Sequence, residues 1–278
     1  MAILMALLSS AVWGTSDFIG GLLSRRYSVY LVVAASQSAG LAAVTVAALV
    51  TGRFTDGLGW VAPSIVAGVG LAVGLVTFYR ALATGTMGMV SPIAALGVLV
   101  PVAVGLLRGD APSAVTSIGV AVALAGAVAA SGPELRGRTG ARPVALAAVS
   151  AVCFGVAMTM LAQGAKANPL MSLWGMRATS VSGMTVVLLV LARSGARFSM
   201  RGTDVPLIVL AGLGDAGANL LFSLATLRGY LSVVSVLASL YPAMTVLLAR
   251  FVLHQRLLPV QLAGIVAALF GVVLVSLG

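Results

Sequence analysis

The chain has 278 residues, of which 60% are hydrophobic and 8% are charged, and its net charge is +10. Soluble domains carry about 25% charged residues, so this composition excludes a soluble fold and indicates a protein embedded in a bilayer. Nearly all the arginines lie between apolar runs, where membrane topology uses them. The positive charge therefore does not indicate nucleic-acid binding.

Ten apolar runs are long enough to cross the hydrocarbon as helices, which takes about 20 residues. In chain order, the predicted spans cover 2–23, 29–50, 60–83, 86–107, 112–131, 143–164, 169–192, 205–227, 230–252 and 258–278. A polar break at 132–142 links a first five-helix unit, 1–131, to a second, 143–278. Because five is odd, the second unit enters the membrane from the opposite side. We expect an all-α membrane protein of ten transmembrane helices in two inverted repeats, a common plan of secondary transporters.

The two predicted units share sequence features. Leu99–Pro101 in the fourth span corresponds to Leu240–Pro242 in the ninth. A proline inside a helix removes a backbone N–H and kinks it, so Pro101 and Pro242 are predicted hinges around a central site. A static kink tolerated inside a bundle is the alternative.

Glycines also match between the units. Gly119 and Gly126 of the fifth span correspond to Gly264 and Gly271 of the tenth. Small residues let membrane helices approach closely, so we interpret these glycines as packing positions.

Single residues limit the possible chemistry. The chain has one cysteine, Cys153, and one histidine, His254, which excludes an internal disulfide and a multi-ligand Cys/His metal centre. We expect no cofactor and no metal. The N-terminal apolar run has no basic region before it, which predicts a membrane helix and not a cleaved signal. Richness in Ala, Gly, Val and Arg points to a bacterial inner (plasma) membrane.

The basic residues predict an orientation. The odd-numbered loops hold Arg25, Arg26, Arg136, Arg138, Arg142, Arg193, Arg197, Arg201, Arg250 and Arg256. The even-numbered loops hold Arg53, Arg108, Lys166 and Arg228. By the positive-inside rule, the odd loops lie in the cytoplasm and both termini lie outside.

Three long stretches and a closing one carry a family resemblance. They are AVWGTSDFIGG at 11–21, YRALATGTMGMVSPIAALGVLVPV at 79–102, LRGYLSVVSVLASLYPAMTVLLARFVLHQRL at 227–257 and LAGIVAALFGVVL at 262–274. The chain resembles a ten-helix member of the drug/metabolite transporter superfamily, built from two EamA-type repeats. The resemblance implies export or exchange of small metabolites or drug-like compounds, often against protons. Many relatives keep their termini in the cytoplasm, opposite to the orientation that the charges predict.

The sequence departs from the family at one motif. The family often has a Gly-Glu pair after the fourth and ninth spans, where this chain has Gly109-Asp110 and His254-Gln255. The acid is shortened in one half and lost in the other, so a role that needs glutamate there does not carry over.

Four charged residues fall inside spans: Asp17, Arg80, Arg177 and Asp215. Each costs about 2.5–3.5 kcal/mol in a bilayer, which makes each a candidate for function. Asp215 is nearest the midplane, and Asn219 lies one helical turn later on the same face. We predict that Asp215 takes up a proton or holds a cationic group while Asn219 orients the substrate. The alternative is a pair of structural ion pairs, Asp17–Arg80 and Arg177–Asp215.

Further candidates surround this site. Trp13 and Asp17 share one face of the first helix, which favours a functional role for both. Arg177 stands where the first half has Gln37, and it is a candidate for holding a substrate carboxylate. Tyr241 and the matched pair Trp13 and Phe154 are candidates for stacking on a substrate, with packing or interfacial anchoring as the commoner alternative.

Two other classes of protein compete with a transporter. The stretch Gly212–Asp215 matches the Gly-x-Gly-Asp pattern of intramembrane aspartyl proteases, with Asp17 as the second carboxylate. A non-transporting membrane scaffold is the other alternative. The preferred prediction is not an enzyme but a secondary transporter exporting a small metabolite, amino acid or drug-like compound. Its expected partners are the lipid bilayer, the small-molecule substrate and, as a candidate coupling ion, protons. The sequence is compatible with both a monomer and a homodimer.

Overall fold

The structure is a computed structural model of the chain, and it describes residues 1–52, 57–84, 87–130, 141–252 and 259–277. Most of these residues are helical, and none of them lies in a strand. The first half contains α1 (Ala2–Ser24), α2 (Val29–Thr51), α3 (Val61–Thr84), α4 (Met87–Ala95), α5 (Leu99–Leu107) and α6 (Ala114–Ala130). Short 3₁₀ turns, η2 (Leu58–Trp60) and η3 (Leu96–Val98), precede α3 and join α4 to α5. The predicted linker 132–142 lies largely outside the described residues.

The second half repeats this order. It contains α7 (Ala141–Ala165), α8 (Pro169–Arg193), α9 (Val205–Thr226), α10 (Leu231–Ala238), α11 (Tyr241–Val252) and α12 (Pro259–Leu277), with the 3₁₀ turn η5 (Gly202–Asp204) before α9. Helix-capping residues in the sequence determine where some of these helices begin. Pro169 occupies the first position of α8, and the Asn168 side chain accepts hydrogen bonds from the backbone N–H groups of Leu170 and Met171.

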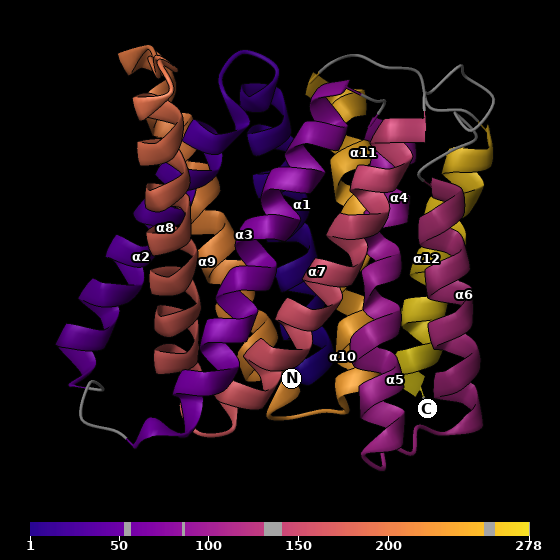
Figure 1. Ribbon diagram of the computed structural model, residues 1–278. Helices are drawn as coiled ribbons and strands as arrows, with labels where there is room; N and C mark the ends of the chain where they lie inside the picture. The colour runs from indigo at the N-terminus through magenta and orange to yellow at the C-terminus, as the bar shows by residue number, and fades with distance from the viewer. Residues whose placement is uncertain (53–56, 85–86, 131–140, 253–258, 278) are drawn as a thin grey trace.

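Six apolar helices are long enough to cross a membrane: Ala2–Ser24, Val29–Thr51, Leu58–Thr84, Ala141–Ala165, Pro169–Arg193 and Gly202–Thr226. Four shorter apolar helices cover the remaining predicted spans: Ile93–Leu107, Ala114–Gly126, Leu231–Thr245 and Leu262–Val275. The helices run side by side along one direction (Figure 1). The prediction of an all-helical, multi-pass membrane protein is therefore confirmed.

The fourth and ninth spans are each built from two stacked helices. Helix α4 lies above α5, and α11 lies above α10, near the middle of the molecule (Figure 1). The helix is interrupted by η3 in the first case and at Ser239 and Leu240 in the second. Pro101 and Pro242 then lie in the first turns of α5 and α11, where a missing N–H is harmless. The expectation of a proline inside a continuous helix is corrected: each proline starts the second segment of a broken one.

Helices α6 and α12 pack against each other at one end of the molecule (Figure 1). A Cβ atom on Gly119 would lie 2.8 Å from the carbonyl oxygen of Gly271, and one on Gly126 would lie 2.8 Å from that of Gly264. The matched glycines thus face one another across the helix pair. Side chains there would force the two backbones apart.

The other helix contacts pair the two halves. Helix α3 packs on α7 and α8, while its counterpart α9 packs on α1 and α2. Helices α2 and α8 also pack on each other. Exchanging the two halves converts the α3–α7 contact into α9–α1 and the α3–α8 contact into α9–α2, and it leaves the α2–α8 contact unchanged.

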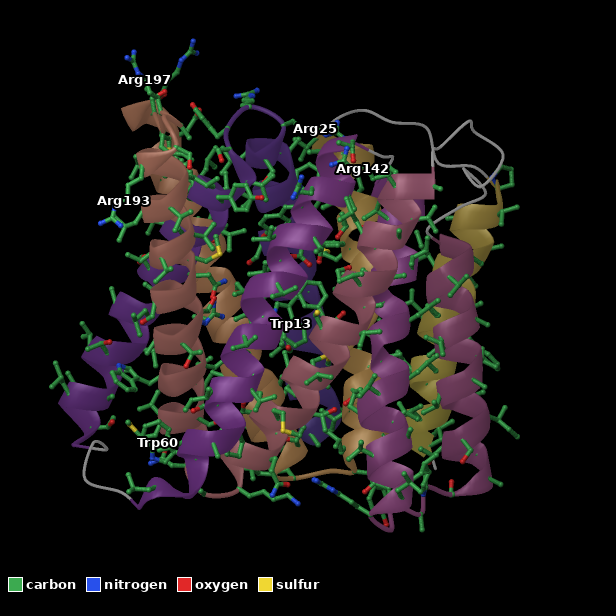
Figure 2. All side chains as sticks on the ribbon, in the orientation of Figure 1. Trp13, Arg25, Trp60, Arg142, Arg193 and Arg197 are labelled. Carbon is green, nitrogen blue, oxygen red and sulfur yellow. The ribbon has the colours of Figure 1, made fainter. Side chains whose placement is uncertain are left out.

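Both termini lie on one face of the molecule, and a basic face lies opposite. Helix α1 runs from the terminal face to Arg25, and α7 starts at Arg142 on that same opposite face and runs back (Figures 1 and 2). Arg193 and Arg197 also lie there (Figure 2). The odd-numbered loops that the structure describes thus share one face. Which side of the membrane this face occupies stays a prediction.

Candidate functional site

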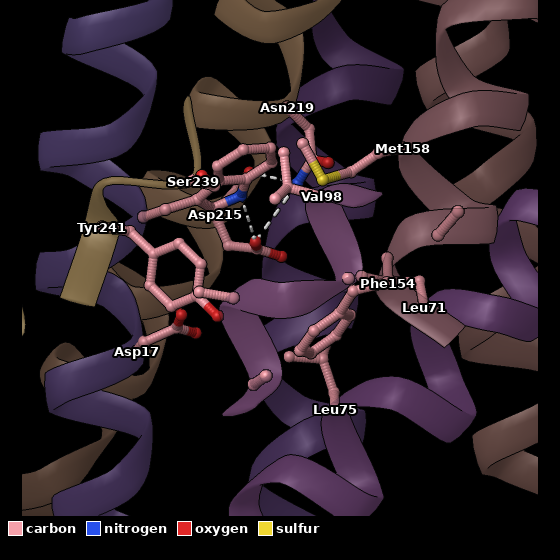
Figure 3. A pocket seen from close by; sticks show the side chains of 15 residues that line it. Asp17, Leu71, Leu75, Val98, Phe154, Met158, Asp215, Asn219, Ser239 and Tyr241 are labelled. Atoms are coloured by element: carbon pink, nitrogen blue, oxygen red, sulfur yellow. Dashed lines mark hydrogen bonds between the residues drawn. The ribbon is translucent and has the colours of Figure 1, made fainter. Parts of the chain in front are cut away.

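A cavity of about 60 Å³ lies where the two broken spans approach each other (Figure 3). Gly97 and Val98 of η3 line it from the first half; Ser239, in the interruption between α10 and α11, and Tyr241, the first residue of α11, line it from the second. Helices α1, α3, α4, α7 and α9 supply the rest of its wall. Irregular backbone at membrane depth occurs only where protein buries it or where it lines a cavity, and substrate sites of transporters are often built this way.

Asp215 on α9 is the most heavily bonded side chain at this cavity. Its Oδ1 accepts hydrogen bonds from Trp13 Nε1 at 3.0 Å and Asn219 Nδ2 at 3.2 Å. Its Oδ2 accepts one from Gln37 Nε2 at 3.1 Å and forms an ion pair with Arg177 Nη1 at 2.6 Å. These partners come from α1, α2, α8 and α9, so one carboxylate joins four helices drawn from both halves.

The partners of Asp215 also hold one another. Arg177 is fully buried, and its Nη1 donates a second bond, to Gln37 Oε1, at 2.6 Å. Asn219 Nδ2 donates to the backbone oxygen of Asp215 at 2.7 Å, which orients the amide. Among the described residues, Nε and Nη2 of Arg177 have no partner. The structure thus brings the predicted partners Arg177 and Asp215 together inside a larger network.

Asp17 on α1 lines the same cavity but differs from Asp215 in its bonding partners. Its side chain is half-buried, and within the described part of the chain no hydrogen bond or ion pair reaches its carboxylate. Arg80 instead donates to Tyr30 Oη at 3.2 Å, with its guanidinium carbon 5.9 Å from the centre of that ring. The predicted pair Asp17–Arg80 is therefore not formed. The face of Tyr30 on α2 attracts the cation instead.

Aromatic rings form part of the cavity wall. Trp13 and Phe154, the matched residues of the first and sixth predicted spans, both line the cavity, as does Tyr241. Buried rings support two of them from behind: the Trp13 and Phe222 ring centres are 5.8 Å apart, and those of Phe154 and Phe78 are 5.6 Å apart. The Tyr241 hydroxyl is buried and has no partner among the described residues.

Asp110 lies at the family's Gly-Glu position, away from the cavity lining. Its Oδ2 accepts hydrogen bonds from the backbone N–H of Ser232 at 2.9 Å and from the Ser232 hydroxyl at 2.8 Å. Ser232 is in the first turn of α10, where an anionic acceptor is favoured. The shortened acid thus ties the end of α5 to the start of α10. The corresponding His254-Gln255 lies outside the described residues.

Sequence reasoning did not single out Gln37 as part of the site, nor the main chain at Gly97 and Ser239. Gln37 carried a signal, since it corresponds to Arg177 and the helices of the two residues pack on each other. For the interrupted backbone at Gly97 and Ser239, the only signal in the sequence was the proline that follows each interruption, Pro101 and Pro242. In the described ranges no group of three His, Cys, Asp or Glu side chains is placed to hold a metal ion.

Comparison with known proteins points to one family. The EamA-like transporter family matches the chain over residues 141–277. A protein crystal structure superposes with a TM-score of 0.79 at 20% sequence identity, covering 99% of this chain and 96% of the other. At this identity the likeness supports the fold alone, and it extends over both halves. A search of curated protein sequences found no match.

Proposed function

Because the chain belongs to the EamA-like transporter family of the drug/metabolite transporter superfamily, we propose that it is a secondary active transporter that exports a small metabolite, amino acid or drug-like compound. The observation that carries the proposal is the cavity at the two helix interruptions. Both halves line it, and it combines an apolar wall with two carboxylates. A bacterial inner membrane is the proposed location, with protons as a candidate coupling ion.

The proposed mechanism is alternating access between two inverted repeats. In its favour, α1 and α7 run in opposite directions, and the helix contacts form sets that exchange when the halves exchange. The matched glycines of α6 and α12 follow the same rule. Five helices per repeat would require this inversion, and inverted repeats supply two equivalent conformations of one cavity.

Two helix pairs are the proposed gates. Helix α4 contacts α11 on one side of the interruptions, and α5 contacts α10 on the other. On the α5–α10 side, the Asp110–Ser232 bonds hold the segments together. Opening one pair while the other stays closed would expose the cavity to one side at a time. Pro101 and Pro242, at the starts of α5 and α11, are the proposed hinges.

The site favours a transporter over the two competing classes. A scaffold has no need of a cavity containing buried charge, since such charge is costly in a membrane. An aspartyl protease needs two carboxylates free to activate water. Asp215 instead accepts bonds on both oxygens and is paired with Arg177.

Efflux from proteoliposomes tests the proposal. Vesicles loaded with a panel of amino acids and small cationic drugs would be given a proton gradient of either sign. We expect gradient-dependent flux that Met158→Trp abolishes, because Met158 lines the cavity and a larger ring would fill it. Val152→Trp is the matched control, since Val152 lies on the same helix and is 60% exposed on its outer surface. Equal flux in both variants would place the pathway elsewhere, and no flux from folded protein would favour a scaffold.

A further inference from the structure

The cavity contains two carboxylates, and only one of them is neutralised. Asp215 is balanced by the guanidinium of Arg177 at 2.6 Å and receives three further donors. Asp17 lines the same cavity with no cation and no donor among the described residues. Of the described residues that line the cavity, none is basic. The lining therefore leaves one carboxyl group, that of Asp17, with no counter-charge from the described residues, and a cationic ligand could supply one.

The unused groups of the cavity are suited to a positively charged ligand. An ionised carboxylate in an apolar environment is costly unless a cation approaches it. The buried Tyr241 hydroxyl, also without a partner in the described structure, lines the same space and offers a hydrogen-bond acceptor. Figure 3 shows Asp17 and Tyr241 at one end of the cavity. A carboxylate and a free hydroxyl together form a receptor for an ammonium group.

The remaining wall is suited to an apolar body. Trp13 and Phe154 contribute rings, and Leu71, Leu75 and Met158 contribute aliphatic or thioether surface. Aromatic faces attract organic cations through their quadrupole, most strongly where water is excluded. Such a wall would bind the hydrocarbon part of an amine while the carboxylate holds its charge.

The same geometry disfavours a ligand that carries its own carboxylate. Among the described residues, Arg177 is the only basic one bonded to this network, but it is fully buried, and it is absent from the cavity lining. Its Nη1 is occupied by Asp215 and Gln37, and its Nε and Nη2, which have no partner among the described residues, are buried away from the cavity lining. The hypothesis that Arg177 holds a substrate carboxylate therefore has no support from this arrangement. An amino acid would leave its carboxylate without a cation.

From these observations we infer that the transported substrate is a compact organic cation, a protonated amine or quaternary ammonium with an apolar body, whose charge is bound by Asp17 and not by Asp215. The inference rests on the proposed function and narrows its substrate class. A cavity of about 60 Å³ has room for only a few waters, at ~10–15 Å³ each on the same measure. An ammonium head fits that space, so the apolar body enters only as the broken helices open.

The test is equilibrium binding to the protein in lipid nanodiscs. The probe is radiolabelled benzyltrimethylammonium, whose charge is permanent, with benzyl alcohol, phenylacetate and phenylalanine as neutral, anionic and zwitterionic competitors. We expect the cation to bind and the three others to compete poorly. Asp17→Asn keeps the shape of the side chain and removes its charge, and it should weaken binding by about tenfold or more. Asp17→Glu should retain most of it.

Asp204→Asn is the matched control. Asp204 lies at the start of α9, outside the cavity lining, where it accepts a hydrogen bond from Tyr27 Oη at 2.5 Å. The Asp204→Asn variant should bind benzyltrimethylammonium with the same binding constant as the wild type. Unchanged binding in Asp17→Asn, or competition by phenylalanine as strong as by the cation itself, would overturn the inference.

A measurement on the wild type covers the case in which Asp17→Asn does not fold. Dicyclohexylcarbodiimide modifies carboxyl groups that can take up a proton in apolar surroundings, which a carboxylate paired with an arginine does poorly, and peptide mass spectrometry locates the product. We expect modification at Asp17 and not at Asp215, and we expect benzyltrimethylammonium to slow it. Modification at Asp215 instead, or no protection by the cation, would contradict the assignment.

Flux distinguishes this inference from the proposed function. If a gradient drives transport of amino acids but not of benzyltrimethylammonium, the protein is a transporter and the inference of an organic-cation substrate is wrong. Binding of the cation through Asp17 without flux of any compound would support the site and refute transport.

Discussion

Asp215 and Asp17 line one cavity, yet their surroundings differ. Asp215 on α9 accepts bonds from side chains on four helices, including its own. Asp17 on α1, in the described structure, has no polar partner. The same type of side chain thus connects helices at Asp215 and has a carboxyl group available for a ligand at Asp17. Depth in the membrane, which made Asp215 the first candidate for substrate binding, does not distinguish these roles; the set of partners does.

The difference has an energetic meaning. Removing one member of a buried, hydrogen-bonded ion pair leaves the other charge uncompensated, which is far more costly than removing the pair together. Removing a charged side chain that has no partner breaks no interaction, so it should change the free energy of unfolding little. Stability should therefore respond strongly to changes around Asp215 and weakly to changes at Asp17, while ligand binding should respond in the opposite order. The following variants test that contrast, from the largest expected effect to the smallest.

Arg177→Met should destabilise the protein most, by about 3–5 kcal/mol, because it leaves the Asp215 carboxylate buried without its cation. The midpoint of unfolding in detergent micelles measures the loss. Arg193→Met is the control, since Arg193 lies exposed in the last turn of the same helix.

The double variant Arg177→Met/Asp215→Leu should recover much of this stability, because it removes both charges and fills the site with apolar groups. If Arg177→Met alone costs no more than Arg193→Met, the network does not hold the helices together, and the contrast with Asp17 fails.

Gly40→Ala should cost about 1–3 kcal/mol, a typical price of overpacking. The added Cβ would lie 2.9 Å from the carbonyl oxygen of Gly212 and 3.5 Å from Nη1 of Arg177, so it would push α2 away from the network. Thermal unfolding monitored by circular dichroism measures the change. Gly217→Ala is the control on α9, where a Cβ meets open space and stability should be unchanged or slightly higher. Similar losses in the two variants would mean that the close approach of Gly40 to Gly212 and Arg177 does not decide the result.

Gln37→Leu should destabilise by about 1 kcal/mol, the order found for interhelical hydrogen bonds in membranes. The variant removes one acceptor from Arg177 and one donor from Asp215 but retains their ion pair. Gln163→Leu is the matched control, because Gln163 accepts only a peripheral bond from Arg108 at 2.7 Å. Chemical denaturation of the two variants side by side measures the difference. A loss as large as that of Arg177→Met would show that the amide, and not the ion pair, dominates the network.

Asp17→Asn should change the unfolding free energy by no more than about 0.5 kcal/mol, as for a side chain with no partner to lose. The same measurement on Asp215→Asn should show a clear loss. Equal losses at the two positions would indicate that Asp17 has a structural partner and would remove the basis for treating the carboxylates differently.

The sequence by itself determined the architecture to a large extent. The bilayer accepts a backbone only if its polar groups are satisfied within the segment, so apolar runs of sufficient length must be helices, and their order is read directly from the chain. Matched features such as Gly119 with Gly264 marked equivalent positions in the two halves. Pro101 and Pro242 marked the two spans that are broken, since a proline limits the backbone locally.

The tertiary structure alone decided which of these residues meet. The pairing of Arg177 with Asp215, and of Arg80 with Tyr30 in place of Asp17, depends on the relative rotation and depth of helices that are distant in the chain. Gln37 joined the network because α2 and α8 pack on each other. Local preferences determine where a helix begins and ends, but the contacts between helices depend on the packing of the whole bundle. For that reason the sequence named both carboxylates, and only the fold showed which one is free.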